Sequence, residues 1–218
     1  MIHKAKISVL LAVYNTDFFL VKRAIDSVLQ QDEQNFELII IDDGSDTFYQ
    51  QQLLKYATQY EQKITYIRHK NCGQSISINK GILHATGDYI TIIDGDDEFK
   101  PNHLKSCLAH MQMADLIAST TETIVDDETD YYVTDKHDSR KVIHVDDCIL
   151  FATLFGKREV FRSFNFENRY AADAHFYERV SEKYAVKKVD LRTYIYYRNM
   201  HNSICATIKR NNLAMQKN

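Results

Sequence analysis

The chain contains the stretch Tyr89-Ile90-Thr91-Ile92-Ile93-Asp94-Gly95-Asp96-Asp97, in which five strand-forming residues precede three carboxylates. A strand that has just ended can turn its last carboxylates toward one point above the sheet edge. Crowded carboxylates raise one another's pKa unless a cation lies between them, so the acidic cluster predicts a divalent-metal site. The alternative interpretation is an acidic turn before a helix, with Asp97 or Glu98 near the helix N-cap.

Composition limits the class of protein. With 218 residues, of which 44% are hydrophobic, the chain has the size of one well-packed domain spanning residues 1–218. Lys and Arg number 27 against 30 Asp and Glu, a net charge of -3, so no global positive field attracts nucleic acid. We predict no nucleic-acid partner, and a phosphate-bearing ligand would have to be bound by a metal or a few placed cations.

Cysteine spacing and hydropathy predict the compartment. The chain has four widely separated cysteines and no C-x-x-C pair: Cys72, Cys107, Cys148 and Cys205. This spacing favours reduced thiols in a cytosolic protein over a zinc cluster or a disulfide framework. The apolar run at residues 7–13 is too short for a signal sequence, and no later run approaches a membrane-spanning length. We expect a soluble cytoplasmic protein with at most peripheral contact at the inner face of the cell membrane, where Lys209 and Arg210 add only weak attraction.

The first half of the chain alternates short apolar runs with helical patterns, which is typical of β-α-β units and a mostly parallel sheet flanked by helices. The predicted strands cover residues 7–13, 36–41, 64–68 and 88–93, and the predicted helices cover residues 17–31, 47–60, 74–85 and 101–113. Gly87 is expected to end the third helix in a left-handed conformation. Pro101 is expected to begin the fourth helix, where its missing N–H costs nothing.

The pattern changes after residue 114. We predict a strand at 115–120, an acidic excursion over 121–134 that contains a strand pair, a short helix at 145–152, a helix at 169–183 and a strand at 189–198. The predicted fold is therefore α/β, with a nucleotide-binding half at about residues 1–113. The second half, about residues 114–218, adds a small antiparallel element and completes the site.

Three predicted strands end in groups that can bind a ligand: Ala12-Val13-Tyr14-Asn15, Asp42-Asp43-Gly44-Ser45 and Asp94-Gly95-Asp96-Asp97. Ligands of open parallel sheets bind outside the carboxyl ends of the strands. A tyrosine ring can stack on a nucleobase, a carboxylate can accept from a ring N–H, and a metal can hold a diphosphate. Neither G-x-G-x-x-G nor a P-loop is present, so we expect a nucleotide-diphosphate site whose phosphates are held by metal.

The order and spacing of four motifs resemble the inverting family 2 glycosyltransferases of the GT-A fold, along nearly the whole chain. The motifs are residues 8–15 (first strand and Tyr-Asn turn), residues 37–45 (second strand and acidic turn), residues 79–90 (Asn79-Lys80-Gly81, then A-x-G-x-Y-I) and the D-x-D element Asp94-Gly95-Asp96. The resemblance implies a GT-A type, Rossmann-like domain. It also implies a divalent cofactor, Mn²⁺ or Mg²⁺, and a nucleotide-diphosphate sugar as donor.

The resemblance also implies a role for each matching residue of the first half. Tyr14, between Ala12 and Asn15, would flank the base, and Asp43 would accept from its ring N–H. Beside Gly95, Asp94 would face the ribose or metal-bound water, and Asp96 would bind the metal directly.

Two matches lie near the end of the chain. Ala172-Asp173-Ala174-His175-Phe176 is similar to the start of the family's catalytic helix, which implies that Asp173 is the general base. The segment from Tyr197 resembles one that closes over the diphosphate, with Arg198 on a phosphate and His201 completing the metal shell. The chain departs from the family in having Ile78 where many members have Arg and Ala172 where Glu is frequent. The first departure implies that a sugar or phosphate contact is either missing or supplied by Lys80 or Arg68.

The implied reaction is inverting transfer of a sugar, with UDP-sugar as the expected donor, to a hydroxyl of a glycan or lipid-linked glycan in bacterial surface polysaccharide synthesis. Two alternatives remain open. One is a sugar-nucleotide nucleotidyltransferase, although the sequence has no glycine-rich G-G-x-G-T-R-like loop near residue 1. The other is a nucleotide-binding relative without catalytic activity.

Overall fold

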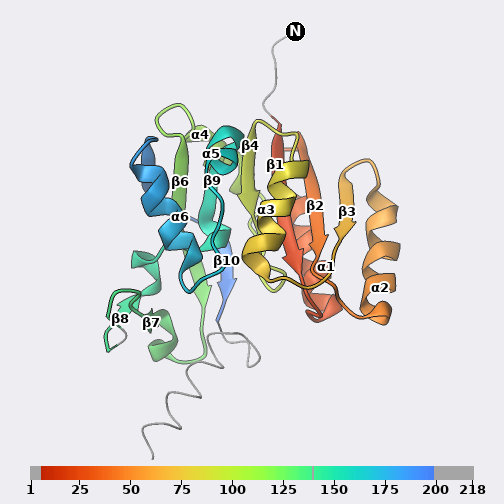
Figure 1. The fold of residues 1–218 in the computed structure, drawn as a ribbon, viewed down its shortest axis with the longest axis horizontal. Coiled ribbons are helices and arrows are strands. Elements are labelled where there is room, and N and C mark those ends of the chain that lie inside the picture. Colours follow the sequence, from red (N-terminus) through yellow and green to blue (C-terminus); the bar gives the residue numbers. More distant parts are fainter. Residues whose placement is uncertain (1–5, 139, 199–218) are drawn as a thin grey trace, which may run out of the picture.

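A computed structural model describes residues 6–138 and 140–198 of the chain (Figure 1). Its strands are β1 (Ile7–Val13), β2 (Phe36–Asp42), β3 (Ile64–Arg68), β4 (Tyr89–Ile92), β5 (Glu98–Phe99), β6 (Leu116–Ile124), β7 (Tyr132–Thr134), β8 (Val142–His144), β9 (Leu154–Lys157) and β10 (Val186–Tyr197). Its α-helices are α1 (Phe18–Leu29), α2 (Thr47–Ala57), α3 (Gln74–His84), α4 (His103–Ala109), α5 (Arg158–Ser163) and α6 (Ala172–Ser181). Short 3₁₀ helices are η1 (Thr58–Tyr60), η2 (Glu128–Tyr131), η3 (Val145–Asp147) and η4 (Phe151–Thr153).

The main sheet has eight strands in the order β3-β2-β1-β4-β9-β6-β10-β5, and β7 and β8 form a separate antiparallel pair. β1 lies between β2 and β4 and is parallel to both, with Leu10 opposite Ile39 and Ile92. The prediction of a mostly parallel α/β sheet with a small antiparallel element in the second half is confirmed. The first-half strands are also where the sequence predicted them, because buried parallel strands are continuous apolar runs.

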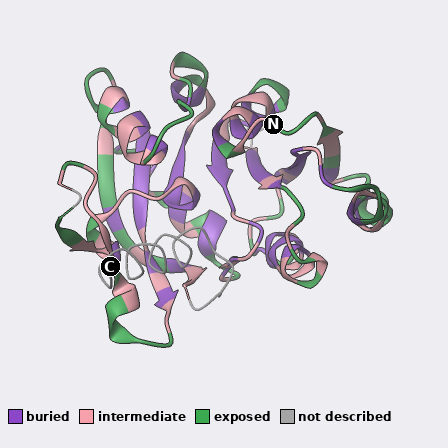
Figure 2. Cartoon of the chain, turned by 60° about the horizontal axis from the view of Figure 1, so that its bottom comes forward, coloured by how far each residue is buried: buried purple, intermediate pink, exposed green. Residues whose placement is uncertain are grey.

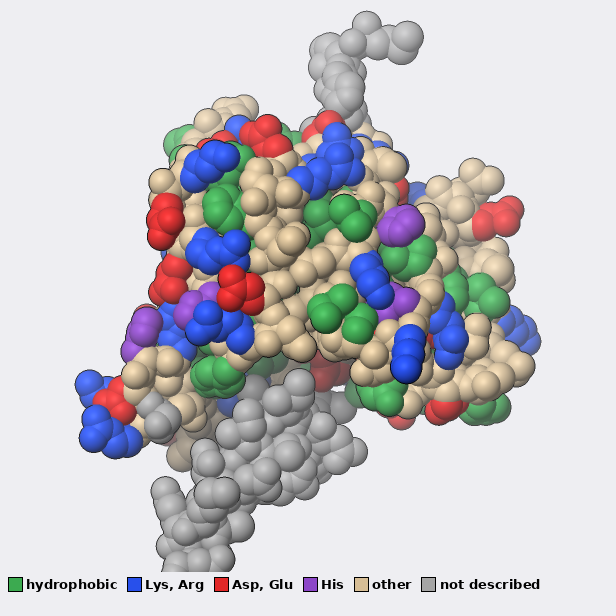
Figure 3. Space-filling model, viewed as in Figure 1, with side chains coloured by type: hydrophobic (Ala, Val, Ile, Leu, Met, Phe, Trp, Pro, Cys, Tyr) green, Lys and Arg blue, Asp and Glu red, His purple; other side chains and the backbone are tan. Residues whose placement is uncertain are grey.

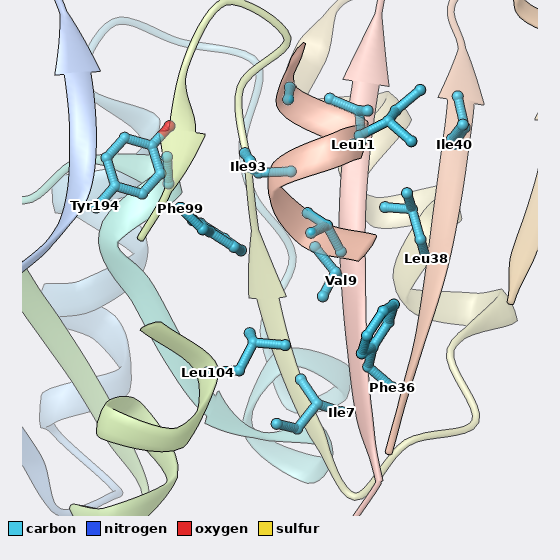
Figure 4. Close-up of a cluster of buried hydrophobic side chains, with 14 of the residues drawn as sticks. Ile7, Val9, Leu11, Phe36, Leu38, Ile40, Ile93, Phe99, Leu104 and Tyr194 are labelled. Carbon is cyan, nitrogen blue, oxygen red and sulfur yellow. The ribbon is translucent and has the colours of Figure 1, made fainter. Parts of the chain in front are cut away.

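Side chains alternate across the sheet and form two cores. Val9 and Leu11 face α1, α2 and α4, and this cluster is shown in Figure 4. Leu10 faces the opposite side, where Ile78 of α3 packs in a second cluster together with side chains of α5 and α6. Figure 2 shows the consequence, with strands buried along most of their length and helices exposed on their outer sides.

Two further features of the described residues are the charges on one face (Figure 3) and the length of the helices. On the face shown in Figure 3, basic and acidic side chains are interspersed. Within residues 6–138 and 140–198, no helix is both long enough and apolar enough to cross a bilayer.

Gly87 does not end α3, contrary to the prediction. The helix ends at His84, its C-cap Ala85 is extended with φ -63° and ψ 127°, and Gly87 does not have a positive φ. The terminal carbonyls are bound instead by α5, since Arg158 donates to Thr86 O at 2.7 Å and Arg162 to Ala85 O at 3.3 Å. A glycine is needed at position 87 for a different reason: a Cβ there would lie 2.7 Å from Ser8 N and 2.8 Å from Lys6 O.

Two predicted helices are shorter or absent. α4 ends at Ala109 rather than near residue 113, because Met111 and Met113 continue the chain in tight turns with i to i-3 hydrogen bonds. Pro101 lies in the turn before the helix rather than at its first residue. Residues 145–152 form η3 and the start of η4, separated by extended backbone at Cys148 and Leu150, instead of one helix.

The second half contains elements that local pattern did not predict. β9 is inserted antiparallel between β4 and β6, where Gly156 lies opposite both Ile90 and Leu116. β8, the partner of β7, lies beyond the acidic excursion in which the strand pair was predicted. β10 begins three residues before the predicted strand and has a register shift between Val189 and Tyr194, where Arg192 has φ 51°.

Gly87→Ala tests the close approach of the chain at residue 87. The added methyl would overlap the backbone at residues 6 and 8, so we expect the free energy of unfolding to fall by about 1–3 kcal/mol. Chemical denaturation would measure the change. Leu83→Ala, at an exposed position on the neighbouring helix α3, is the control and should change stability by less than about 0.5 kcal/mol. A Gly87→Ala protein as stable as the wild type would contradict the steric argument.

Candidate active site

The loops after β1 and β2 are joined by two hydrogen bonds. Asn15 N donates to Ser45 Oγ at 3.1 Å, and Asn15 Oδ1 accepts from Asp46 N at 2.8 Å. Asn15 has φ 47°, a left-handed conformation that asparagine tolerates better than most residues. This turn leaves Tyr14, which follows the half-buried Ala12 and the buried Val13, 53% exposed at the edge of the sheet.

Asp42 and Asp43 at the end of β2 have different partners. Asp42 is buried and accepts from Ser45 N at 2.8 Å and Tyr66 Oη at 2.5 Å, contacts that fix the turn. The carboxylate of Asp43 accepts from the backbone N–H groups of Cys72 and Gly73, both at 2.8 Å. Asp43 therefore holds the segment that leads into α3, and each of its oxygens retains a further lone pair.

Asp94 lies among other acidic groups. Its Oδ1 accepts from Gln74 Nε2 at 2.8 Å, and Gln74 is the first residue of α3. Burial raises the pKa of Asp94 to about 7, and repulsion by Asp96 and Asp173 adds to the effect of burial. The structure thus brings Asp173, 79 residues later in the sequence, into the electrostatic field of the acidic cluster.

The Asp96 carboxylate is half-buried, and burial raises its pKa, although the positive charge of Arg23 opposes this shift. Arg23 comes from α1, and its Nη2 donates to the backbone carbonyl of Asp96 at 2.5 Å. The same guanidinium lies 3.1 Å from Glu98 Oε1 and 4.0 Å above the ring of Tyr197. Arg23 therefore stabilises the backbone of the acidic loop without binding the Asp96 carboxylate.

Asp97 joins the acidic loop to the last strand. It is buried and accepts from Tyr194 Oη at 2.6 Å and from Tyr197 N at 2.8 Å. Burial, then repulsion by Asp94 and Asp96, raises its pKa well above the usual range. The Asp97 carboxylate thus binds β10 and does not act as a helix cap.

Asp173 is in the first turn of α6, after Ala171, whose left-handed φ of 52° redirects the chain. Its carboxylate accepts from Ala174 N at 2.8 Å and from Phe151 N at 3.1 Å. Burial raises the pKa of Asp173 to about 6, while these hydrogen bonds and the charge of Lys136 oppose the shift. Two backbone N–H groups thus orient this carboxylate, and burial makes it easier to protonate than a solvated aspartate.

Arg198 follows β10, which is parallel to β6. Its backbone N–H donates to Ile124 O at 2.8 Å, and its Nη2 lies 3.4 Å from Tyr132 O. Its Nε and Nη1 are buried and have no hydrogen-bond partner among the described residues, so they are available to an anionic ligand. His201, the other residue predicted near the diphosphate, lies outside the described residues.

Several residues of the site were not predicted from the sequence. Gln74, Arg23 and Tyr194 contact the acidic loop, and Lys136 approaches Asp173. Only Gln74 had a usable signal, as the first residue of a helix that follows a parallel strand. Ile78, where an arginine is frequent in the resembling family, is fully buried, and Arg68 is occupied by Asp42 and Ser45.

The residues present can hold a hard divalent cation. Asp94 and Asp96 supply carboxylate oxygens, the ligands that Mg²⁺ and Mn²⁺ prefer. The raised pKa of each carboxyl indicates negative charge that lacks compensation, and a cation would supply it. A second group of possible ligands, Asp43, His69 and Cys72, lies at the ends of β2 and β3 and mixes oxygen, nitrogen and sulfur.

Comparisons with known proteins show the family and the fold of the chain. The family model described as glycosyl transferase family 2 matches residues 8–185. The putative colanic acid biosynthesis glycosyl transferase WcaA of Escherichia coli is 48% identical over 92 residues, which cover 41% of this chain and 32% of the relative. The putative glycosyltransferase EpsE of Bacillus subtilis is 37% identical over 108 residues, which cover 49% and 38% of the two proteins. The chain thus matches about a third of the length of each relative.

Two solved structures have the same fold. One is TarS 1–349 of S. aureus in complex with UDP-GlcNAc, with a TM-score of 0.72 and 17% identity, covering 93% of this chain and 60% of that one. The other is the mannosyltransferase PcManGT from Pyrobaculum calidifontis in complex with GDP-Man and Mn²⁺, with a TM-score of 0.69 and 16% identity, covering 89% and 57%. At 16% and 17% identity, this structural similarity establishes the fold alone.

Asp94→Asn tests the electrostatic strain of the acidic cluster. The folded-state pKa of Asp94 is about 7, above the ordinary value of 3.8, so the folded chain binds more protons between these values and stability falls as pH rises through them. In chelator-treated buffer we expect Asp94→Asn to raise the free energy of unfolding by about 1–2 kcal/mol at about pH 8 and to change it little at about pH 4.

Chemical denaturation at both pH values would measure this difference. Asp32→Asn, at an exposed turn, is the control and should have an equally small effect at both. An Asp94→Asn effect that is the same at the two pH values would mean that Asp94 is not under electrostatic strain.

Proposed function

The chain belongs to glycosyl transferase family 2, and from this premise we propose that it is a metal-dependent inverting glycosyltransferase. It transfers a sugar from a nucleotide-diphosphate donor to a hydroxyl of a glycan or lipid-linked glycan. One observation carries the proposal, the family match over residues 8–185, and repulsion between Asp173 and Asp94 supports placing the proposed base near the proposed donor site. A base and a donor must meet in this way for direct displacement at the sugar.

The donor half of the proposed site is formed by residues of about 1–113. Tyr14 flanks the nucleobase, Asp43 accepts from its ring N–H, and Asp94 faces the ribose. Asp96, with His201, binds Mn²⁺ or Mg²⁺, and Arg198 offers its unpaired guanidinium nitrogens to a phosphate. We propose UDP-sugar as the donor class; among the structural neighbours, TarS was solved with UDP-GlcNAc and PcManGT with GDP-Man.

The acceptor half is formed by residues of about 114–218 and supplies the base. Asp173 takes the proton of the acceptor hydroxyl as that oxygen attacks the sugar carbon opposite the leaving diphosphate. The hydrogen bonds from Phe151 N and Ala174 N hold its carboxylate in one orientation through this step. A bound cation would supply charge stabilisation to the departing diphosphate.

The proposed biological role is bacterial surface polysaccharide synthesis at the cytoplasmic face of the membrane. The name of the Escherichia coli relative, putative colanic acid biosynthesis glycosyl transferase, supports this role. A nascent polysaccharide attached to a lipid would require only peripheral contact between protein and membrane.

The test is release of free nucleoside diphosphate from a panel of nucleotide sugars, with Mn²⁺ or Mg²⁺ and glycan or glycolipid acceptors. Acceptor-dependent release of UDP supports the proposal. Synthesis of a nucleotide sugar with release of pyrophosphate would instead support a nucleotidyltransferase. Tight binding of UDP without turnover on any acceptor would support a catalytically inactive relative.

Asp173→Asn tests the base. We expect a fall in kcat of about 10²–10⁴-fold, the usual contribution of general-base catalysis, with donor affinity unchanged because the amide keeps the size of the side chain. Product formation and calorimetric UDP binding would measure the two effects. Asp147→Asn, at an exposed carboxylate in a nearby loop, is the control and should retain transfer. Near-normal transfer by Asp173→Asn would rule out the assignment of the base.

Asp96→Ala tests the metal ligand. We expect UDP binding to lose its dependence on Mn²⁺, because the change removes a carboxylate ligand of the cation. Titration of UDP with and without Mn²⁺ would show this, and binding in the absence of metal serves as the internal reference. If Mn²⁺ strengthened UDP binding equally in the variant and the wild type, the cation would have other ligands.

A further inference from the structure

A compact group of three metal-ligating atoms lies beside the proposed nucleobase end of the site. Asp43 comes from the end of β2, His69 follows β3, and Cys72 precedes α3. Asp43 Oδ1 lies 3.4 Å from His69 Nδ1 and 3.5 Å from Cys72 Sγ, and the nitrogen and sulfur lie 3.4 Å apart. One oxygen, one nitrogen and one sulfur thus form a nearly equilateral triangle.

This triangle has the dimensions of one face of a zinc tetrahedron. Zinc binds nitrogen and oxygen at about 2.0–2.1 Å and sulfur at about 2.3 Å, so tetrahedral ligand atoms lie about 3.3–3.6 Å from one another. All three measured separations fall in this range. Thiolate and imidazole ligands favour Zn²⁺ over Mg²⁺ or Mn²⁺, whereas carboxylates such as Asp94 and Asp96 suit Mg²⁺ and Mn²⁺.

The surroundings orient the three ligands. Cys72 N and Gly73 N donate to the Asp43 carboxylate and fix its plane, leaving lone pairs free. Lys80 Nζ lies 3.7 Å from Cys72 Sγ and donates a hydrogen bond to the sulfur. Nδ1 of His69 also lies 2.8 Å from Lys70 O, so zinc binding requires the ring proton to move to Nε2, which is buried without a partner among the described residues.

We propose that Asp43, His69 and Cys72 bind one Zn²⁺ ion, with the fourth position open, and that this ion excludes the nucleotide. The exclusion of the nucleotide rests on the proposed function, in which the Asp43 carboxylate accepts from the nucleobase. The zinc site itself does not rest on the proposed function. Zinc is therefore an inhibitor that competes with the donor at a place separate from the proposed Mn²⁺ or Mg²⁺ site.

Zinc binding is tested on the full chain without nucleotide, by equilibrium dialysis of Zn²⁺ in excess Mg²⁺, which occupies the proposed site at Asp96. We expect one bound Zn²⁺ per chain, weakened at least about tenfold by Cys72→Ser and by His69→Gln. Cys148→Ser and His84→Gln, at a second half-buried thiol and an exposed imidazole, are matched controls and should bind zinc as the wild type does.

Co²⁺ provides a readout that does not depend on the stability of any variant. Bound to the wild type at this site, it should show a thiolate-to-cobalt charge-transfer band. A wild-type chain that binds no zinc, a cobalt complex without this band, or full zinc binding by folded Cys72→Ser would each overturn the zinc site.

Competition is tested by titrating UDP in saturating Mg²⁺ at several Zn²⁺ concentrations. We expect the apparent Kd for UDP to rise in proportion to free Zn²⁺ in the wild type and to stay constant in Cys72→Ser, which also controls for chelation of zinc by UDP. Simultaneous, independent binding of both ligands would overturn the exclusion. Zinc binding by a chain with no affinity for any nucleotide would contradict the proposed function and leave the zinc site supported.

Discussion

The hydrogen bonds of the buried Asp97 carboxylate connect the two halves of the site. Tyr194 Oη and Tyr197 N of β10 both donate to it, and Tyr194 Oη also accepts from Asp94 N at 3.3 Å. One tyrosine hydroxyl thus fixes two residues of the acidic loop against the last strand. Because Arg198 follows this strand directly, its position relative to Asp94 and Asp96 depends on the same contact. Without these donors the buried Asp97 carboxylate would strongly destabilise the fold. The acidic loop and β10 therefore depend on each other.

The acidic loop also carries negative charge that is only partly compensated, and this charge opposes the stabilising effect of its hydrogen bonds. Burial raises the pKa of Asp94, Asp96 and Asp97 together, and the first and last of these carboxyls also repel their neighbours. Arg23 compensates only part of this repulsion, since it binds the Asp96 carbonyl and Glu98 rather than a carboxylate of the cluster. The folded chain therefore carries electrostatic strain at the place where a cation and a diphosphate would bind. Such strain is frequent where function requires groups that stability alone would separate.

The sequence predicted the parts of the structure that depend on residues close together in the chain. Continuous apolar runs predicted β1 and β3 with their observed bounds, and β2 to within one residue, because both faces of a parallel strand are buried. Gly87 was interpreted as a helix cap, but the requirement at this position comes from the backbone at Lys6 and Ser8, which no local pattern shows. β9 was missed for a similar reason, since a four-residue strand is defined by its partners β4 and β6. Motifs predicted that the acidic loop and Asp173 belong to one site, whereas Arg23 reaches the loop only through the tertiary fold.

The same limit applies to the proposed zinc ligands. Cysteine spacing argued against a zinc cluster, and within the described residues only one cysteine lies in the group. Its two partners come from the ends of different strands, which parallel pairing of β2 with β3 brings together. The topology that collects carboxylates at the end of β4 therefore also collects a mixed donor set at the ends of β2 and β3. Because hard and soft cations prefer different donors, one edge of a sheet can present two sets of ligands that suit different cations.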